Sequence, residues 1–181
     1  LFAKEGIFFL SGHSYLGAVM PMQIIMPTLL FIGLTNIMGI QMLVPLGKEK
    51  VVLCSEVVGV FVDVVINILL IPKVASSGAA IGTLVAEISV FIVQYFVLKD
   101  TVKSAFKKVN YIAIISSILI SSILSSMVKK LQLGLFITLC FSAILFFGIY
   151  IFILTIIKEP LIIEIEKQLL NKIFKKHKKG K

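Results

Sequence analysis

Two neighbouring stretches decide the fold: VVLCSEVVGVFVDVVINILLI (51–71) and GAAIGTLVAEISVFIVQYFVL (78–98). Each is long and apolar enough for a transmembrane helix, which needs roughly 20 such residues. The intervening PKVASS (72–77) predicts a tight turn, because proline and serine interrupt the apolar pattern. The pair therefore predicts an antiparallel membrane hairpin.

The same pattern extends to the rest of the chain, in which hydrophobic residues make up 59% of 181 positions. It predicts an all-α polytopic membrane bundle with five spans, at 16–44, 51–71, 78–98, 110–128 and 133–157. We expect residues 13–157 to form this bundle and residues 1–12 to be the end of a preceding span or an outer loop. We expect residues 158–181 to form a cytoplasmic amphipathic helix with a polybasic tail. The chain begins at Leu1 without an initiator methionine, so we expect a C-terminal part of a longer protein.

The basic residues predict the orientation of the bundle. All 18 are lysines, of which fourteen fall on the side that carries the C-terminus and four on the other side. The positive-inside rule therefore places the C-terminus in the cytoplasm. The net charge of +9 lies in loops and tail, so we expect anionic membrane lipids, and no nucleic acid, as its partners.

Three carboxylates, Glu56, Asp63 and Glu87, lie inside the predicted hairpin. An ionised carboxylate near the bilayer centre costs about 2.5–3.5 kcal/mol on insertion scales. Such groups normally face the interior of a bundle or a wet cavity. Their presence favours a protein that moves a solute over a passive anchor.

Polar residues repeat with matching spacings on the two arms, so antiparallel pairing brings them to equal depths. The predicted pairs are Glu56 with Gln94, Asp63 with Glu87, and Asn67 with Thr83. Asp63 and Glu87 come near the middle of the bilayer, and two adjacent carboxylates cannot both ionise cheaply. This is typical of a proton- or cation-coupled site. The alternative is that the two groups face different neighbours and each is simply hydrogen-bonded there.

Two prolines interrupt the first span and make it a candidate bending element. Pro21 and Pro27 each remove a backbone donor, which kinks a helix. Transporters use broken helices of this kind for gating. A static kink that neighbouring groups satisfy is the equally weighted alternative.

Small residues predict two close helix contacts. Gly78 and Gly82 form a GxxxG motif at the start of the third span, and Ser117, Ser121 and Ser125 form a ridge on the fourth. The chain carries no glycine-rich phosphate loop, HExxH motif or Ser/His/Asp cluster. We therefore expect no catalytic residue, metal site or cofactor, and a protein that is not an enzyme.

The sequence resembles the C-terminal lobe of Wzx-type flippases of the multidrug/oligosaccharidyl-lipid/polysaccharide exporter superfamily. The likeness lies in GAVMPMQIIMPTLLFIGLTNIMGIQMLVPLGKEK (17–50) and NILLIPKVASSGAAIGTLVAEISVFIVQY (67–95). Its carriers are Gln41, PLGKEK (45–50), Asn67 and Pro72 in NILLIP, and Gly78–Ala80, Thr83 and Glu87 in GAAIGTLVAE. It covers most of residues 14–98. Asp63 departs from the family, which more often has asparagine or an apolar residue there.

The resemblance implies two six-helix lobes around a central cavity, of which this chain supplies the last five of twelve spans. It implies a transporter in the bacterial cytoplasmic membrane that flips polyprenyl-diphosphate-linked oligosaccharide units by alternating access, with an ion gradient as the driving force. The N-terminal lobe of the same protein is then a partner and holds the basic residues that bind the diphosphate. The alternatives are a cation-coupled multidrug exporter of the same superfamily and, less favoured, a membrane glycosyltransferase or polymerase or a non-transporting assembly subunit.

Overall fold

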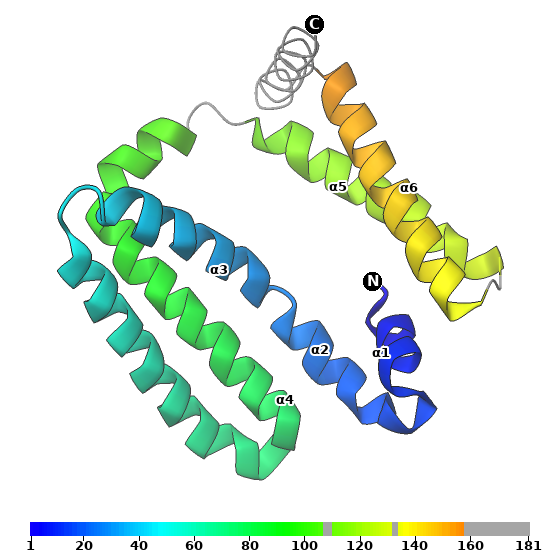
Figure 1. The fold of residues 1–181 in the computed structure, drawn as a ribbon, viewed down its shortest axis with the longest axis horizontal. Coiled ribbons are helices and arrows are strands. Elements are labelled where there is room, and N and C mark those ends of the chain that lie inside the picture. Colours follow the sequence, from blue (N-terminus) through cyan, green and yellow to red (C-terminus); the bar gives the residue numbers. More distant parts are fainter. Residues whose placement is uncertain (107–109, 132–133, 158–181) are drawn as a thin grey trace, which may run out of the picture. The chain divides into compact units, whose positions relative to one another are not determined.

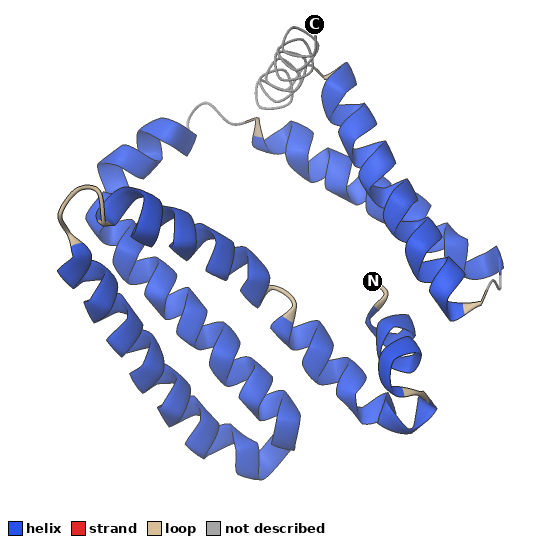
Figure 2. Ribbon diagram, viewed as in Figure 1, coloured by secondary structure: helices blue, strands red, loops and turns tan. Residues whose placement is uncertain are grey.

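Helices are the only regular elements in the part of the chain that the structure describes, residues 1–106, 110–131 and 134–157 of a computed structural model (Figure 2). Four helical segments there are long and apolar enough to cross a membrane: His13–Leu43, Glu49–Lys103, Tyr111–Leu131 and Leu135–Ile156. The protein is a polytopic membrane helix bundle, which confirms the predicted fold class.

Two compact units make up the chain, and each is described by itself. The first runs from Ala3 to Lys107, and the second comprises Leu1–Phe2 and Lys108–Lys181. All three predicted carboxylates belong to the first unit.

The predicted hairpin is formed by α4 (Glu49–Phe106), whose two arms run antiparallel (Figure 1). The backbone leaves helical geometry only at Val74 and at Ala75, where φ is +48°. A non-glycine residue seldom adopts this left-handed backbone, so the reversal is abrupt. The hairpin is confirmed, but the turn is shorter than predicted because the helix continues through Pro72.

The predicted first span is a succession of short helices rather than one rod. After α1 (Ala3–Ser11) come η1 (His13–Ala18), α2 (Val19–Ile25), α3 (Thr28–Asn36) and η2 (Ile37–Leu43). The first, third and fourth of these are α-helical, η1 is a 3₁₀-helix, and η2 is a π-helix.

The segment from α3 to η2 packs against α4. The rings of Phe31 on α3 and Phe91 on the second arm of α4 meet edge to face, with centroids 5.7 Å apart. Further along, Met38 and Leu43 of η2 are buried against Leu98 and Val102. This apolar contact fixes η2 beside the hairpin.

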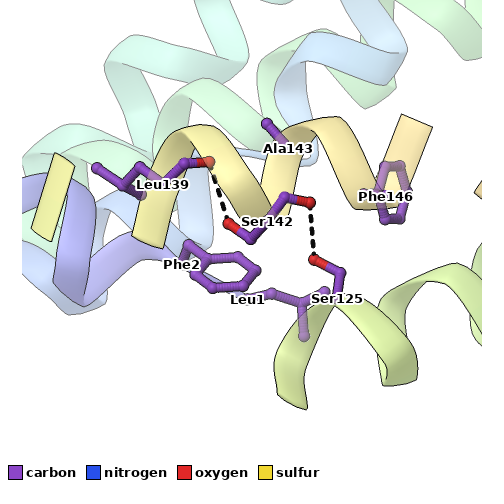
Figure 3. Close-up of a pocket in the computed structure, with 7 residues that line it drawn as sticks. All are labelled: Leu1, Phe2, Ser125, Leu139, Ser142, Ala143 and Phe146. Carbon is purple, nitrogen blue, oxygen red and sulfur yellow. Dashed lines mark hydrogen bonds between the residues drawn. The ribbon is translucent and has the colours of Figure 1, made fainter. Parts of the chain in front are cut away.

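The second unit contains α5 (Tyr111–Ser126), the 3₁₀-helix η3 (Met127–Leu131) and α6 (Leu135–Ile156). The serine ridge of α5 is buried, as predicted, and the Ser125 hydroxyl donates to the Ser142 carbonyl oxygen of α6 at 3.0 Å (Figure 3). A mostly apolar cavity of about 300 Å³ lies beside this bond, lined by Leu139, Phe146 and the first two residues of the chain among others. The ridge is therefore a helix-packing feature.

The predicted amphipathic helix and polybasic tail, residues 158–181, lie outside the described residues.

Candidate functional site

Glycines let the two arms of α4 approach each other closely. A Cβ atom added to Gly78 would lie 2.6 Å from the backbone carbonyl carbon of Leu70, and one added to Gly59 would lie 2.5 Å from Cγ2 of Val90. A Cβ atom at Gly82 would collide with the Asn67 amide oxygen. The close contact predicted from the GxxxG motif is therefore confirmed, and Gly59 extends it along the first arm.

The first cleft of the site lies between the arms, and we call it the hairpin cleft. It has a volume of about 200 Å³. Its polar lining consists of Glu56, Asp63, Thr83 and Glu87. The structure thus brings the three carboxylates, including the predicted pair Asp63 and Glu87, to one cavity.

Asn67 binds Asp63, which lies on its own arm, rather than its predicted partner Thr83 on the other arm. Its Nδ2 donates to Oδ2 of Asp63 at 3.1 Å, one helical turn away. The remaining oxygens, Oδ1 of Asp63 and Oδ1 of Asn67, are buried without a hydrogen-bond partner among the described residues. Unsatisfied acceptors of this kind are costly in an apolar setting, so a hydrogen-bond donor reaching them would stabilise this part of the hairpin.

The second cleft lies between the α3–η2 segment and α4, and we call it the α3 cleft. Its volume is about 210 Å³. Its polar lining comes from both sides of the crossing: Thr35, Asn36, Glu56, Glu87 and Gln94. Glu56 and Glu87 therefore line both clefts and connect them.

Gln94 pairs with Ser55 instead of with the predicted partner Glu56. The Gln94 Nε2 donates to the Ser55 Oγ at 3.1 Å, and both side chains are buried, with 1% and 0% exposure. The prediction was displaced by one residue, since it matched only the depths of the two positions, and neighbouring residues of a helix differ in depth by about 1.5 Å. Glu56 instead lies exposed beside this bond and opens onto the clefts.

The predicted break in the first span occurs at Pro27. Pro27 stands between α2 and α3, and the amide of Leu29 there bonds to the Met26 carbonyl over three residues instead of four. Pro21 lies within the first turn of α2, where the 3₁₀-helix η1 passes directly into the α-helix. The two prolines are therefore not equivalent.

Sequence reasoning missed the π-helix η2, in which Gly39 faces the Gln94 amide. A Cβ atom at Gly39 would lie 3.2 Å from Nε2 and 3.4 Å from Oε1 of Gln94. π-Helical turns occur frequently at functional sites. The one sequence signal for this close approach was a glycine in an apolar span. It could not identify Gln94 as the facing residue, because Gln94 lies far away in the sequence.

Comparison with known proteins finds similarity to a membrane protein, in agreement with the apolar helices described above. Over 167 residues the chain is 28% identical to the uncharacterized membrane protein MJ1068 of Methanocaldococcus jannaschii. This similarity covers 92% of the chain and 32% of the relative, so the chain spans about a third of that protein's length. Neither a family model nor a solved structure matches the chain.

Proposed function

We propose that the protein functions as part of a flippase that carries polyprenyl-diphosphate-linked oligosaccharide repeat units across the cytoplasmic membrane of a bacterium. The units serve capsule, O-antigen or other cell-surface polysaccharide synthesis, and translocation proceeds by alternating access driven by an ion gradient. The protein carries out transport and is not an enzyme.

The observation that carries this proposal is the pair of clefts that share Glu56 and Glu87 within otherwise apolar helices. Carboxylates in such a position normally belong to ion pathways or coupling sites. The helix break at Pro27 lies on the segment that leads to the α3 cleft, as expected of a bending element. The resemblance of residues 14–98 to Wzx-type flippases supplies the substrate class.

The anionic carrier requires basic groups, and neither cleft is lined by a lysine in the described part of the chain. We therefore assign recognition of the diphosphate to the N-terminal lobe of the same protein. The C-terminus lies in the cytoplasm, where the lysine-rich tail contacts anionic lipid headgroups.

A cation-coupled multidrug exporter is the second candidate. The acidic, lysine-free lining of both clefts favours it, because cationic drugs would be attracted there. A membrane glycosyltransferase or polymerase is less favoured, since no acidic metal cluster occurs among the described residues.

Reconstitution of the complete gene product into vesicles tests these candidates. The vesicles carry a fluorescent polyprenyl-diphosphate oligosaccharide, and an impermeant glycosidase reports how much sugar reaches the outer leaflet. We expect the accessible fraction to exceed that of protein-free vesicles. Movement of a cationic dye without movement of the oligosaccharide would establish the exporter instead, and an immobile oligosaccharide would overturn the flippase.

A further inference from the structure

We propose that α5, η3 and α6 hold one anionic phospholipid of the membrane. Its acyl chain lies in the cavity beside the Ser125–Ser142 hydrogen bond, and its phosphate lies at Lys129 and Lys130. The cavity has a volume of about 300 Å³ and lies at the end of α5 that leads into η3 (Figure 3). Both lysines belong to η3. The carboxylate clefts on which the proposed transport function rests take no part in this site.

The first argument is the chemistry of the cavity wall. Its lining is mostly apolar and includes Phe2, Leu139 and Phe146 (Figure 3). The two hydroxyls beside it are already engaged, because Ser125 donates to the Ser142 carbonyl at 3.0 Å and Ser142 donates to the Leu139 carbonyl at 3.1 Å. A hydroxyl has one proton to donate, so neither offers a donor to a polar solute. The cavity therefore suits a hydrocarbon chain.

The second argument is the depth of the cavity in the membrane. With 22 residues, α6 matches the thickness of the hydrocarbon core, and its first residue, Leu135, lies close to the end of η3 at Leu131. From that start, the rise of a helix places Leu139 about 6 Å and Phe146 about 16 Å along the axis. Half of the hydrocarbon core is about 15 Å. The cavity therefore lies at the depth of an acyl chain in a single leaflet.

The third argument is the position of Lys129 against the cavity wall. Its Nζ donates to the Leu1 carbonyl oxygen at 2.7 Å and lies 4.6 Å from the centroid of the Phe2 ring. Both Leu1 and Phe2 line the cavity, so the ammonium group stands at its rim. The next residue, Lys130, is also exposed. Lysines at the ends of membrane helices place their charge at the level of the headgroups, where a lipid phosphate lies.

The fourth argument is the charge balance of this part of the chain. No aspartate or glutamate occurs from residue 101 to residue 158, a stretch that includes α5, η3 and α6. The charges of Lys129 and Lys130 are therefore not balanced within these three helices. An anionic headgroup supplies the complementary charge, whereas a zwitterionic headgroup brings no net charge. The site should therefore select an anionic phospholipid.

The test is photolabelling of the complete protein in phosphatidylcholine vesicles. The probes are phosphatidylglycerol and phosphatidylcholine that carry the same diazirine-bearing acyl chain, and mass spectrometry measures the yield of each on the 139–146 segment of α6. We expect the phosphatidylglycerol probe to label this segment more strongly, and excess unlabelled phosphatidylglycerol to suppress the labelling. Because the yield is read on α6, lipid bound at the lysine-rich tail does not contribute to it.

The headgroup seat is tested with lysine variants. Lys129→Gln and Lys130→Gln should each lower the preference for phosphatidylglycerol by about fivefold, since each removes one basic charge near the membrane surface. Lys73→Gln is the matched control, because Lys73 is equally exposed but lies at the α4 turn, in the other compact unit. It should keep the wild-type preference.

The acyl-chain seat is tested by filling the cavity. Ala143 lines it at an exposed position, so Ala143→Phe fills the space without displacing a buried neighbour. Labelling by the phosphatidylglycerol probe should then fall to the level of the phosphatidylcholine probe. Ile144→Phe is the matched control, because Ile144 is 70% exposed and lies outside the cavity lining. It should be labelled like the wild type.

Equal labelling of wild-type α6 by the two probes would overturn the proposal even if every variant misfolded. Absence of labelling there would overturn it as well, since another part of the complete protein would then fill the cavity. An undiminished preference in Ala143→Phe, or in both lysine variants, would place the lipid elsewhere. Suppression by a polyprenyl diphosphate at lower concentrations than by phosphatidylglycerol would assign the cavity to the carrier lipid and overturn the phospholipid site.

Discussion

Ser55 and Gln94, 39 residues apart in sequence, are joined across the α4 hairpin by a hydrogen bond of 3.1 Å from Nε2 to Oγ. Because both side chains are fully buried, the bond fixes the register of the two arms at the end nearest η2. A shift by one residue would place Glu56 against Gln94 and bury a carboxylate that now opens onto the clefts. The pairing of two neutral groups therefore keeps the charged group accessible.

Ser55→Ala should destabilise the protein, since it removes the acceptor of the buried Gln94 amide. Interhelical hydrogen bonds in membrane proteins contribute about 0.6 kcal/mol on average and up to about 1.7 kcal/mol. Unfolding in SDS should report a loss in this range. Ser89→Ala is the control, because the Ser89 hydroxyl donates only within its own helix, to the Val85 carbonyl at 2.8 Å. Equal losses in both variants would contradict a special role for the cross-hairpin bond.

Gly78→Ala should separate the two arms near the turn. The new Cβ atom would meet the Leu70 backbone at 2.6 Å, and backbone cannot move aside as a side-chain end can. Overpacking of this kind costs typically about 1–3 kcal/mol. Gly33→Ala on α3 is the matched control, since nothing lies within 4 Å of its added Cβ atom. Unfolding in SDS measures the stability of both variants. A Gly78→Ala protein that is as stable as the Gly33→Ala protein would show that the arms are less closely packed.

Asp63→Asn and Glu87→Gln should each slow transport of the oligosaccharide lipid by the complete protein. Asp63→Asn removes an ionisable group from the hairpin cleft, and Glu87→Gln removes the ionisable group shared by both clefts. Initial rates in the vesicle assay, measured at several pH values, give the readout. Unchanged rates and an unchanged pH dependence in both variants would leave these carboxylates with a structural role only.

Hydropathy predicted the spans because their lengths and apolar composition leave few alternatives, and the hairpin followed from the short polar interruption at 72–77. Depth along the two arms correctly predicted which polar residues lie near one another, because Asp63, Thr83 and Glu87 line one cleft. The Ser55 contact could not be predicted, because a rotation of one residue about the helix axis changes hydropathy very little. The π-helix η2 was equally hidden, since it depends on packing against α4 and no local residue type specifies it.

Two serines of α5 should respond oppositely to alanine. Ser125→Ala removes the hydrogen bond to the Ser142 carbonyl and should destabilise the α5–α6 pair by about 0.6 kcal/mol. Ser121 is equally buried, but its hydroxyl has no hydrogen-bond partner among the described residues. Ser121→Ala removes an unsatisfied polar atom and should be neutral or stabilising. SDS unfolding of the two variants provides the comparison, and a larger loss for Ser121→Ala would contradict the assignment of the bond.

Pro27→Ala should make α2 and α3 continuous, whereas Pro21→Ala should change little. Alanine at position 27 supplies the N–H that can bond to the Gln23 carbonyl, and proline inside a helix costs about 3 kcal/mol. Pro21 lies where η1 and α2 are already contiguous, so alanine there joins no separated helices. We therefore expect Pro27→Ala to raise resistance to SDS and to narrow the distance distribution between spin labels on α2 and α3.

The same variant separates a hinge from a static kink. If the chain bends at Pro27 during transport, a continuous helix resists that movement, so Pro27→Ala should be more stable and slower in the vesicle assay while Pro21→Ala transports normally. A Pro27→Ala protein that is straightened in the spin-label measurement yet transports at the wild-type rate would show that the break is static. The coupling of the α3 cleft to transport would then have to come from the movement of α4 or of η2, whose Gly39 faces the Gln94 amide.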